Sequence, residues 1–311
     1  MIYLVIPCYN EQDVLMDTNR RLLALLPEIP TPTSILYVDD GSTDGTWNII
    51  MHLCQEHNAV RGLRLSHNVG QQTATWAGME HCLKDADAVI SVDADLQDDI
   101  HVIPRMVHDW QQGIDVVYGV RHHRESDSWM KRWTALLFYR VMGWLGCETI
   151  YNHSEFRLLS RRAVEALLSY PERNLFVRGL VSQLGFNVEL EYYDRQPRLA
   201  GETKYSISKL AALAFDGVSS FSVRPLHWIL LAGLSFIVVA VCVIGWALFN
   251  HFTGRTVMGW TSLLVSVWFV GGCLLLALGL IGEYVGKVYK ETKRRPRYFV
   301  MDSIRLADEQ I

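Results

Sequence analysis

SVDADLQDD, residues 91–99, follows the apolar run Ala88-Val89-Ile90, which is typical of a buried strand. Four carboxylates, those of Asp93, Asp95, Asp98 and Asp99, lie within seven residues of this stretch. Like charges at such spacing repel one another, and they are costly to remove from water. An acidic cluster at the end of a core strand therefore indicates a binding site for a positively charged ligand.

The N-terminal part of the chain alternates between short apolar runs and longer helical patterns. We expect strands at 2–6, 34–38, 62–65, 88–92 and 115–118, and helices near 11–26, 45–56, 70–82 and 103–112. This alternation predicts an α/β fold with a mainly parallel sheet covered by helices on both faces. Ligands of such sheets bind beyond the carboxyl ends of the strands.

A polar cluster follows each of the first four expected strands. The clusters are residues 7–11 (PCYNE), 39–45 (DDGSTDG), 66–70 (SHNVG) and the opening stretch. Any one of them could be a loop or a helix cap, as Asp44 before Gly45 would be. Because parallel strands end at the same edge of a sheet, the four together predict one binding site.

The acidic residues of this edge favour a hard divalent cation that carries the phosphates of a nucleotide. Asp93 and Asp95 alternate along the chain, and at a strand end both can turn toward one ion, Mg²⁺ or Mn²⁺. No GxGxxG follows the first strand and no GxxxxGK[ST] occurs anywhere, which argues against a dinucleotide dehydrogenase and a P-loop NTPase.

Composition narrows the class of protein further. A net charge of −4 over 311 residues argues against a nucleic-acid binder. The six cysteines form no CxxC pair, which fits reduced thiols in the cytosol. The start, MIYLVIPCYN, lacks a basic n-region and is expected to be a strand rather than a signal peptide.

Two long apolar segments predict a membrane protein. Residues 226–249 and 260–281 contain no Asp, Glu, Lys or Arg, and about 20 apolar residues suffice to cross the hydrocarbon core. Basic residues flank the pair: Arg224 before it and a cluster between Lys287 and Arg297 after it. The excess of basic residues places both termini in the cytoplasm and the linker outside.

Residues 129–146 (WMKRWTALLFYRVMGWLG) mix tryptophans and basic residues, as helices lying in a membrane interface do. We therefore expect a cytoplasmic domain over 1–205, with 129–146 as an interfacial helix. An amphipathic juxtamembrane segment over 206–225, a two-helix transmembrane region over 226–285 and a basic cytoplasmic tail over 286–311 would follow it.

Several motifs in this order resemble the family 2 glycosyltransferases of the GT-A fold. Within that family, the chain is similar to the polyprenyl-phosphate glycosyltransferases, relatives of dolichol-phosphate mannose synthase, and above all to the GtrB-type bactoprenol glucosyltransferases. Besides the clusters at 7–11, 39–42 and 93–98, the resemblance covers FRL at 156–158, PERN at 171–174, GETKY at 201–205, GEY at 282–284 and RPRY at 295–298.

The resemblance implies roles at the matching positions. The nucleotide-sugar would contact a set of residues from the first four strand ends and two later arginines: Pro7, Tyr9, Asn10, Glu11, Asp39, Asp40, Asn68, Asp93, Ala94, Arg121 and Arg132. The metal would lie near Asp93, Asp95 and Gln97. Catalysis would involve Asp95 and Glu155, together with Arg198 on phosphate and Lys204 in a closing loop.

Two departures from the family pattern stand out. Relatives have Gln-Asp-Pro-Pro-Glu where this chain has residues 97–101, QDDIH, which changes the loop after the metal site. Relatives also have Asp where this chain has Glu155, before Phe156. Glu155 acts near the sugar or acceptor on one interpretation, and as a buried ion-pair partner of Arg157 on the other.

The resemblance thus implies an inverting enzyme that moves a hexose, glucose, from a UDP-sugar to undecaprenyl phosphate. It would sit in the bacterial cytoplasmic membrane as a multi-pass protein that contacts membrane lipid, and a homo-oligomer, a tetramer, is implied as well. The alternatives are the same chemistry with UDP-GlcNAc or another sugar nucleotide, a processive polysaccharide synthase, and a non-catalytic sugar-nucleotide-binding scaffold.

Overall fold

The computed structural model describes residues 1–121, 153–172, 177–194 and 260–305, with isolated positions between 229 and 242. These residues belong to two compact units. One unit is an α/β domain that includes the N-terminal 121 residues and, from the far end of the chain, residues 295–305. The other holds one long helix, α10 (Trp260–Thr292).

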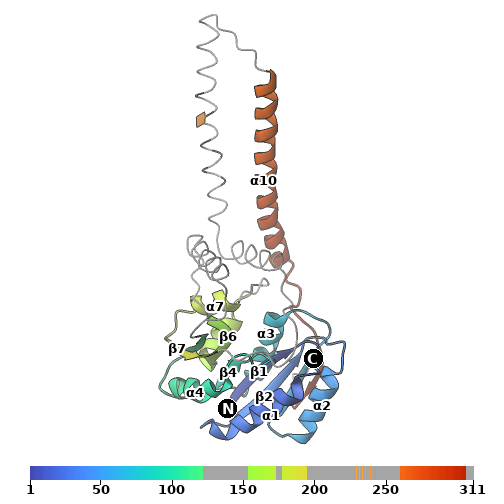
Figure 1. The fold of residues 1–311 in the computed structure, drawn as a ribbon, viewed down its shortest axis with the longest axis vertical. Coiled ribbons are helices and arrows are strands. Elements are labelled where there is room, and N and C mark those ends of the chain that lie inside the picture. Colours follow the sequence, from blue (N-terminus) through green and yellow to red (C-terminus); the bar gives the residue numbers. More distant parts are fainter. Residues whose placement is uncertain are drawn as a thin grey trace, which may run out of the picture. The chain divides into compact units, whose positions relative to one another are not determined.

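An eight-stranded sheet forms the centre of the α/β domain, in the order β7-β5-β6-β4-β1-β2-β3-β8 (Figure 1). The strands are β1 (Ile2–Cys8), β2 (Thr33–Asp39), β3 (Val60–Leu65), β4 (Ala88–Ser91), β5 (Val116–Arg121), β6 (His153–Ser160), β7 (Val188–Tyr193) and β8 (Val300–Ile304). Strands β4, β1, β2 and β3 run parallel. The predicted mainly parallel α/β sheet is confirmed.

Helices cover both faces of the sheet. They are α1 (Leu15–Leu25), α2 (Thr46–Glu56), α3 (Gln71–Cys82), α4 (Ile103–Gln111), α6 (Arg161–Leu168) and α7 (Val177–Gln183), with short 3₁₀ turns η1 (Leu26–Glu28) and η2 (Ile100–Val102). One face of β1 and β2 packs in a single core with α1, α2 and α4. On the other face Gly78 of α3 lies against Val5 and Val38, where a Cβ would be 2.5 Å from Val5 Cγ1.

Three strands join the sheet in ways that the sequence analysis did not anticipate. Strand β6 inserts between β4 and β5 and runs antiparallel to both. Strand β7 pairs in parallel with β5. Strand β8 comes from the segment assigned to the basic tail and pairs antiparallel with β3. The residues after α10 are therefore part of the central sheet, and residues 297–305 are named the C-terminal strap.

The strap is held to the α/β domain by side chains as well as by its strand. The guanidinium of Arg297 lies 4.2 Å from the centre of the Trp76 ring on α3. The same group donates to the carbonyl oxygens of Tyr170 at 2.7 Å and Glu172 at 2.6 Å. The Tyr298 hydroxyl donates to Glu80 at 2.8 Å. The strap thereby joins α3 to the segment that follows α6.

Helix α10 is apolar enough to cross a membrane. The stretch Phe269–Tyr289 has a mean hydropathy of 1.8, and side chains such as Leu275 are exposed rather than packed in a core. Within the described residues it is the one helix of this kind. The other predicted membrane segment, 226–249, falls almost wholly outside the described residues. Its crossing of the membrane therefore stays a prediction.

Candidate functional site

The ends of β1 and β2 are joined by hydrogen bonds between the first two polar clusters. The backbone N–H of Asp40 donates to the carbonyl of Cys8 at 2.8 Å. The N–H of Asn10 donates to Ser42 Oγ at 3.0 Å, and Asn10 Oδ1 accepts from the N–H of Thr43 at 2.9 Å. Asn10 adopts a left-handed conformation with φ of 54°, which asparagine tolerates well. The two loops therefore form one rigid rim.

Asp39 and Asp40 are both buried at the end of β2. The two oxygens of Asp40 accept the backbone N–H groups of Val69 and Gly70 at 2.8 and 2.9 Å, which attaches the third polar cluster. Asp39 accepts from the N–H of Ser42 at 3.1 Å. Burial raises the pKa of Asp39 and of Asp40, and these hydrogen bonds act in the opposite direction.

The remaining residues of the predicted nucleotide pocket surround this rim. Tyr9 is 40% exposed and Asn68 is exposed, so both are accessible to a ligand. Pro7 lies within β1, and the N–H of Glu11 donates to Thr46 Oγ1 at 2.9 Å at the start of α2. The structure therefore brings the predicted residues of β1, β2 and β3 to one edge of the sheet.

The opening stretch continues this edge as a tight turn after β4. Gln71, the first residue of α3, donates from Nε2 to Asp93 Oδ1 at 2.6 Å. The carbonyl of Ala94 accepts from Thr18 Oγ1 at 2.7 Å, and Leu96 has a left-handed φ of 45°. Desolvation, reinforced by the neighbouring carboxylates, raises the pKa of Asp93 to about 7. The turn concentrates negative charge.

The carboxylate of Asp98, beside this turn, forms an ion pair with Arg121. Asp98 Oδ1 accepts from Arg121 Nε at 3.2 Å and Nη2 at 2.9 Å, and from the hydroxyl of Tyr193 at 2.6 Å. Although burial lowers it, the pKa of Arg121 is raised overall by Asp98 and Tyr193. Arg121, expected on phosphate, thus anchors the acidic turn in this structure.

Glu155 accepts a hydrogen bond from Arg157 Nη2 at 2.5 Å, and Arg157 is completely buried. The ion-pair interpretation of Glu155 is therefore confirmed. Glu155 also contributes to the raised pKa of Asp93, which places it close to the acidic turn. Its role near the sugar or acceptor stays a prediction.

The acidic turn fits a divalent cation bound together with phosphate. Among the described residues, no three His, Cys, Asp or Glu side chains gather closely enough to hold a metal alone. Mg²⁺ commonly uses one or two carboxylates and takes its other ligands from water and substrate phosphate. Asp93 and Asp95 provide such a pair, and buried Gln97 lies beside them in the same turn.

Part of the predicted site lies outside the described residues. This holds for Arg132, Arg198 and Lys204, for the interfacial helix at 129–146 and for the segment 206–225. Conversely, three residues at the edge were missed: Gln71, Tyr193 and Asp98, the last named only as part of a loop. Gln71 was detectable because it starts the helix after the third cluster, whereas nothing in the sequence marks Tyr193.

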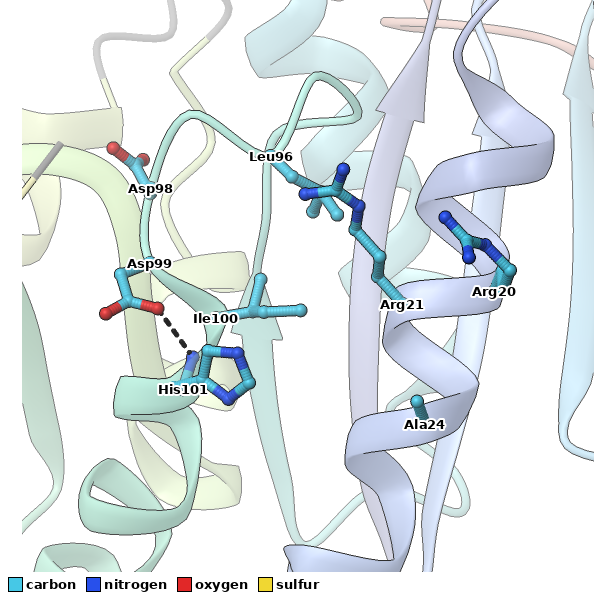
Figure 2. Close-up of a pocket in the computed structure, with 8 residues that line it drawn as sticks. All are labelled: Arg20, Arg21, Ala24, Leu96, Asp98, Asp99, Ile100 and His101. Atoms are coloured by element: carbon cyan, nitrogen blue, oxygen red, sulfur yellow. Dashed lines mark hydrogen bonds between the residues drawn. The ribbon is translucent and has the colours of Figure 1, made fainter. Parts of the chain in front are cut away.

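A pocket of about 320 Å³ opens behind the acidic turn, between α1 and residues 96–101. Figure 2 shows Arg20 and Arg21 rising from α1 on one wall, and Asp98 pointing away from them on the other. Both arginines form ion pairs with Asp17. Leu96, Asp98 and Asp99 of the acidic stretch line the pocket, but neither Asp93 nor Asp95 does.

Aspartates at the carboxyl ends of parallel strands lie where such sheets bind ligands, and a pair of carboxylates suits a divalent cation bound with phosphate. The chain belongs to glycosyl transferase family 2, whose model matches residues 3–168. It is therefore a glycosyltransferase.

Relatives align along nearly the whole chain. An uncharacterized glycosyltransferase of Bacillus subtilis, YkoT, is 44% identical over 100% of this chain and 94% of its own length. The bactoprenol glucosyl transferase of Shigella phage SfX is 38% identical over 96% of this chain and 98% of its own. Among solved structures, glucosyl-3-phosphoglycerate synthase of Mycobacterium tuberculosis has a TM-score of 0.49 and 16% identity, covering 70% of this chain and 76% of that one.

Proposed function

We propose that the protein transfers glucose from UDP-glucose to undecaprenyl phosphate. The observation that carries the proposal is the alignment with the bactoprenol glucosyl transferase of Shigella phage SfX, 38% identical over 96% of this chain and 98% of its own. Such coverage includes the segments after the catalytic domain as well as the domain itself. A lipid acceptor also accounts for an enzyme that carries an apolar helix such as α10.

The donor is bound along the polar edge. Uridine lies against the rim formed by the β1 and β2 loops, with accessible Tyr9 and Asn68 beside it. Asp39 and Asp40 hold that rim in shape, because their oxygens accept backbone N–H groups from Ser42 and from Val69 and Gly70. The diphosphate points toward the acidic turn, with Asp93 and Ala94 next to it and Arg132 as a phosphate contact, while Arg121 stays paired with Asp98.

A divalent ion, Mg²⁺ or Mn²⁺, is held by Asp93 and Asp95, with Gln97 close by. The chemistry that such an ion supplies is neutralisation of the charge on the departing UDP. The role of the protein is to hold the two carboxylates together despite their repulsion. Gln71 fixes the position of Asp93 by its hydrogen bond at 2.6 Å.

The acceptor needs no strong general base. The second pKa of a phosphate monoester is about 6, so the lipid phosphate is already largely ionised at neutral pH. Arg198 orients this phosphate, Lys204 closes the loop over it, and Glu155 lies near the sugar. Attack from the face opposite UDP inverts the anomeric carbon, and the rate depends mainly on positioning.

The test is to incubate the purified full chain with undecaprenyl phosphate, Mn²⁺ and a panel of UDP-sugars, and to identify the lipid product by mass. We expect a hexosyl-phosphate lipid from UDP-glucose. If product forms only from UDP-GlcNAc, the transferred sugar is N-acetylglucosamine instead of glucose, and the proposed transfer reaction still holds. Binding of UDP-sugar without release of UDP when lipid is added would contradict the proposal and indicate a scaffold.

The variant Asp95→Asn tests the metal assignment in the same assay. It keeps the shape of the side chain and removes its charge, so we expect turnover to fall about 10³-fold with the thermal midpoint nearly unchanged. Asp99→Asn is the matched control, since Asp99 belongs to the same acidic stretch but accepts from the N–H of His101 at the start of η2. Equal activity of both variants would contradict the assignment of Asp95 as a metal ligand.

A further inference from the structure

The acidic turn is kept in a strained conformation by anchors on both of its sides. Leu96 has a φ of 45°, a left-handed conformation that costs a non-glycine residue roughly 1–2 kcal/mol. Such a conformation persists only where its surroundings determine it. Before Leu96, the anchors are the bonds from Gln71 to Asp93 and from Thr18 to Ala94.

The anchor after Leu96 is Asp98, which is 2% exposed. One of its oxygens accepts three hydrogen bonds, two from Arg121 and one from Tyr193. In Figure 2 its carboxylate points away from Arg20 and Arg21, so the arginines of α1 are not its partners. The donors come from the carboxyl ends of β5 and β7, where Arg121 and Tyr193 are paired in register.

Tyr193 is itself rigidly placed. It is 3% exposed, and its ring meets that of Phe156 edge to face, with the centroids 5.6 Å apart. Gly119 leaves room for this pair, because a Cβ at that position would lie 2.6 Å from Phe156 and 3.0 Å from Tyr193. A fixed ring gives its hydroxyl a fixed direction, so the bond of 2.6 Å to Asp98 defines where Asp98 can be.

We propose that Tyr193 is a positioning residue for the metal-dependent part of donor binding, acting through Asp98 on the turn that carries Asp93 and Asp95. This inference rests on the proposed function, because it takes the donor to be a UDP-sugar bound with a divalent ion. Tyr193 touches neither. Its hydroxyl holds the far side of the turn, so its loss lets Leu96 relax and the two aspartates separate.

The experiment measures the affinity of the purified full chain for UDP by calorimetry, once with Mn²⁺ and once with EDTA. For Tyr193→Phe, which retains the ring, we expect UDP affinity with Mn²⁺ to fall about tenfold. Affinity in EDTA should stay unchanged, because the uridine rim on β1 and β2 is separate from the turn. A role in stability alone would lower the thermal midpoint and leave the effect of Mn²⁺ intact.

Tyr3→Phe is the matched control. Tyr3 is completely buried in β1, and its hydroxyl has no hydrogen-bond partner among the described residues. This variant removes the same atom from the same sheet, and we expect both UDP affinities to match those of the unsubstituted protein. An unchanged effect of Mn²⁺ in Tyr193→Phe would overturn the inference.

If Tyr193→Phe does not fold, Asp98→Asn tests the inference instead. It is judged by the same criterion, the effect of Mn²⁺ on UDP affinity. Where both fold, the double variant should bind UDP no more weakly than Asp98→Asn alone, since Tyr193 acts on the turn only through Asp98. Multiplied effects would overturn the inference. If the unsubstituted protein binds UDP no better with Mn²⁺ than in EDTA, the proposed donor chemistry fails, and the inference fails with it.

Discussion

At the scale of single residues, Gly41 joins two of the polar clusters by its lack of a side chain. Its φ is +66°, and a Cβ there would lie 2.5 Å from the carbonyl carbon of His67 and 2.7 Å from the nitrogen of Asn68. These are backbone atoms, which cannot turn aside. The loops after β2 and β3 can therefore approach each other only with glycine at this position.

We expect Gly41→Ala to lower the free energy of unfolding by about 3 kcal/mol, because it combines left-handed strain with a steric clash. Gly113→Ala is the control: Gly113 has a φ of +96° but no atom within 4 Å of its Cβ position, so it should lose only about 1 kcal/mol. Urea unfolding in detergent measures both. Equal losses would contradict the close approach of the two loops.

At the scale of elements, the C-terminal strap makes the sequence after α10 part of the catalytic domain. Its strand closes one edge of the sheet, and Arg297 connects α3 with the carbonyls of Tyr170 and Glu172. Helix α3 begins with Gln71, which holds Asp93. The strap thereby supports the helix on which part of the acidic turn depends.

Arg297→Ala should lower the free energy of unfolding of the α/β domain by about 2 kcal/mol, since it removes two charged hydrogen bonds and a cation–π contact. Arg295→Ala removes an exposed arginine two residues before Arg297 and should cost little. Thermal unfolding followed by tryptophan fluorescence compares the two. A loss no larger in Arg297→Ala than in Arg295→Ala would show that the strap is held by its strand alone.

At the scale of the whole molecule, the distribution of basic residues predicts the orientation of the chain in the membrane. In a variant without native cysteines, a cysteine placed at Thr253 in the linker should react with a membrane-impermeant maleimide in intact spheroplasts. A cysteine at Glu28, which is exposed on the α/β domain, should react only after the membrane is opened. Labelling of Glu28→Cys in intact spheroplasts would contradict a cytoplasmic catalytic domain.

Prediction from the sequence was most successful where signals were local. The first five strands and first four helices lie within a few residues of their expected positions, because continuous apolar runs and helical periodicity depend on neighbours in the chain. Strand β6 was missed because its buried Arg157 interrupts the apolar pattern. Strand β8 was missed because an edge strand of five residues is defined by its partner β3 rather than by its own composition.

Patterns along the chain were enough to predict the α/β alternation, the polar cluster after each parallel strand and the acidic turn. The ion pairs of the site appear only in the folded chain, where Arg121 pairs with Asp98 and Arg157 with Glu155. It also brought Tyr193 and the C-terminal strap to the catalytic domain. The physical reason is that hydrogen bonds and ion pairs between distant segments depend on distance in space, and that distance exists only once the sheet has formed.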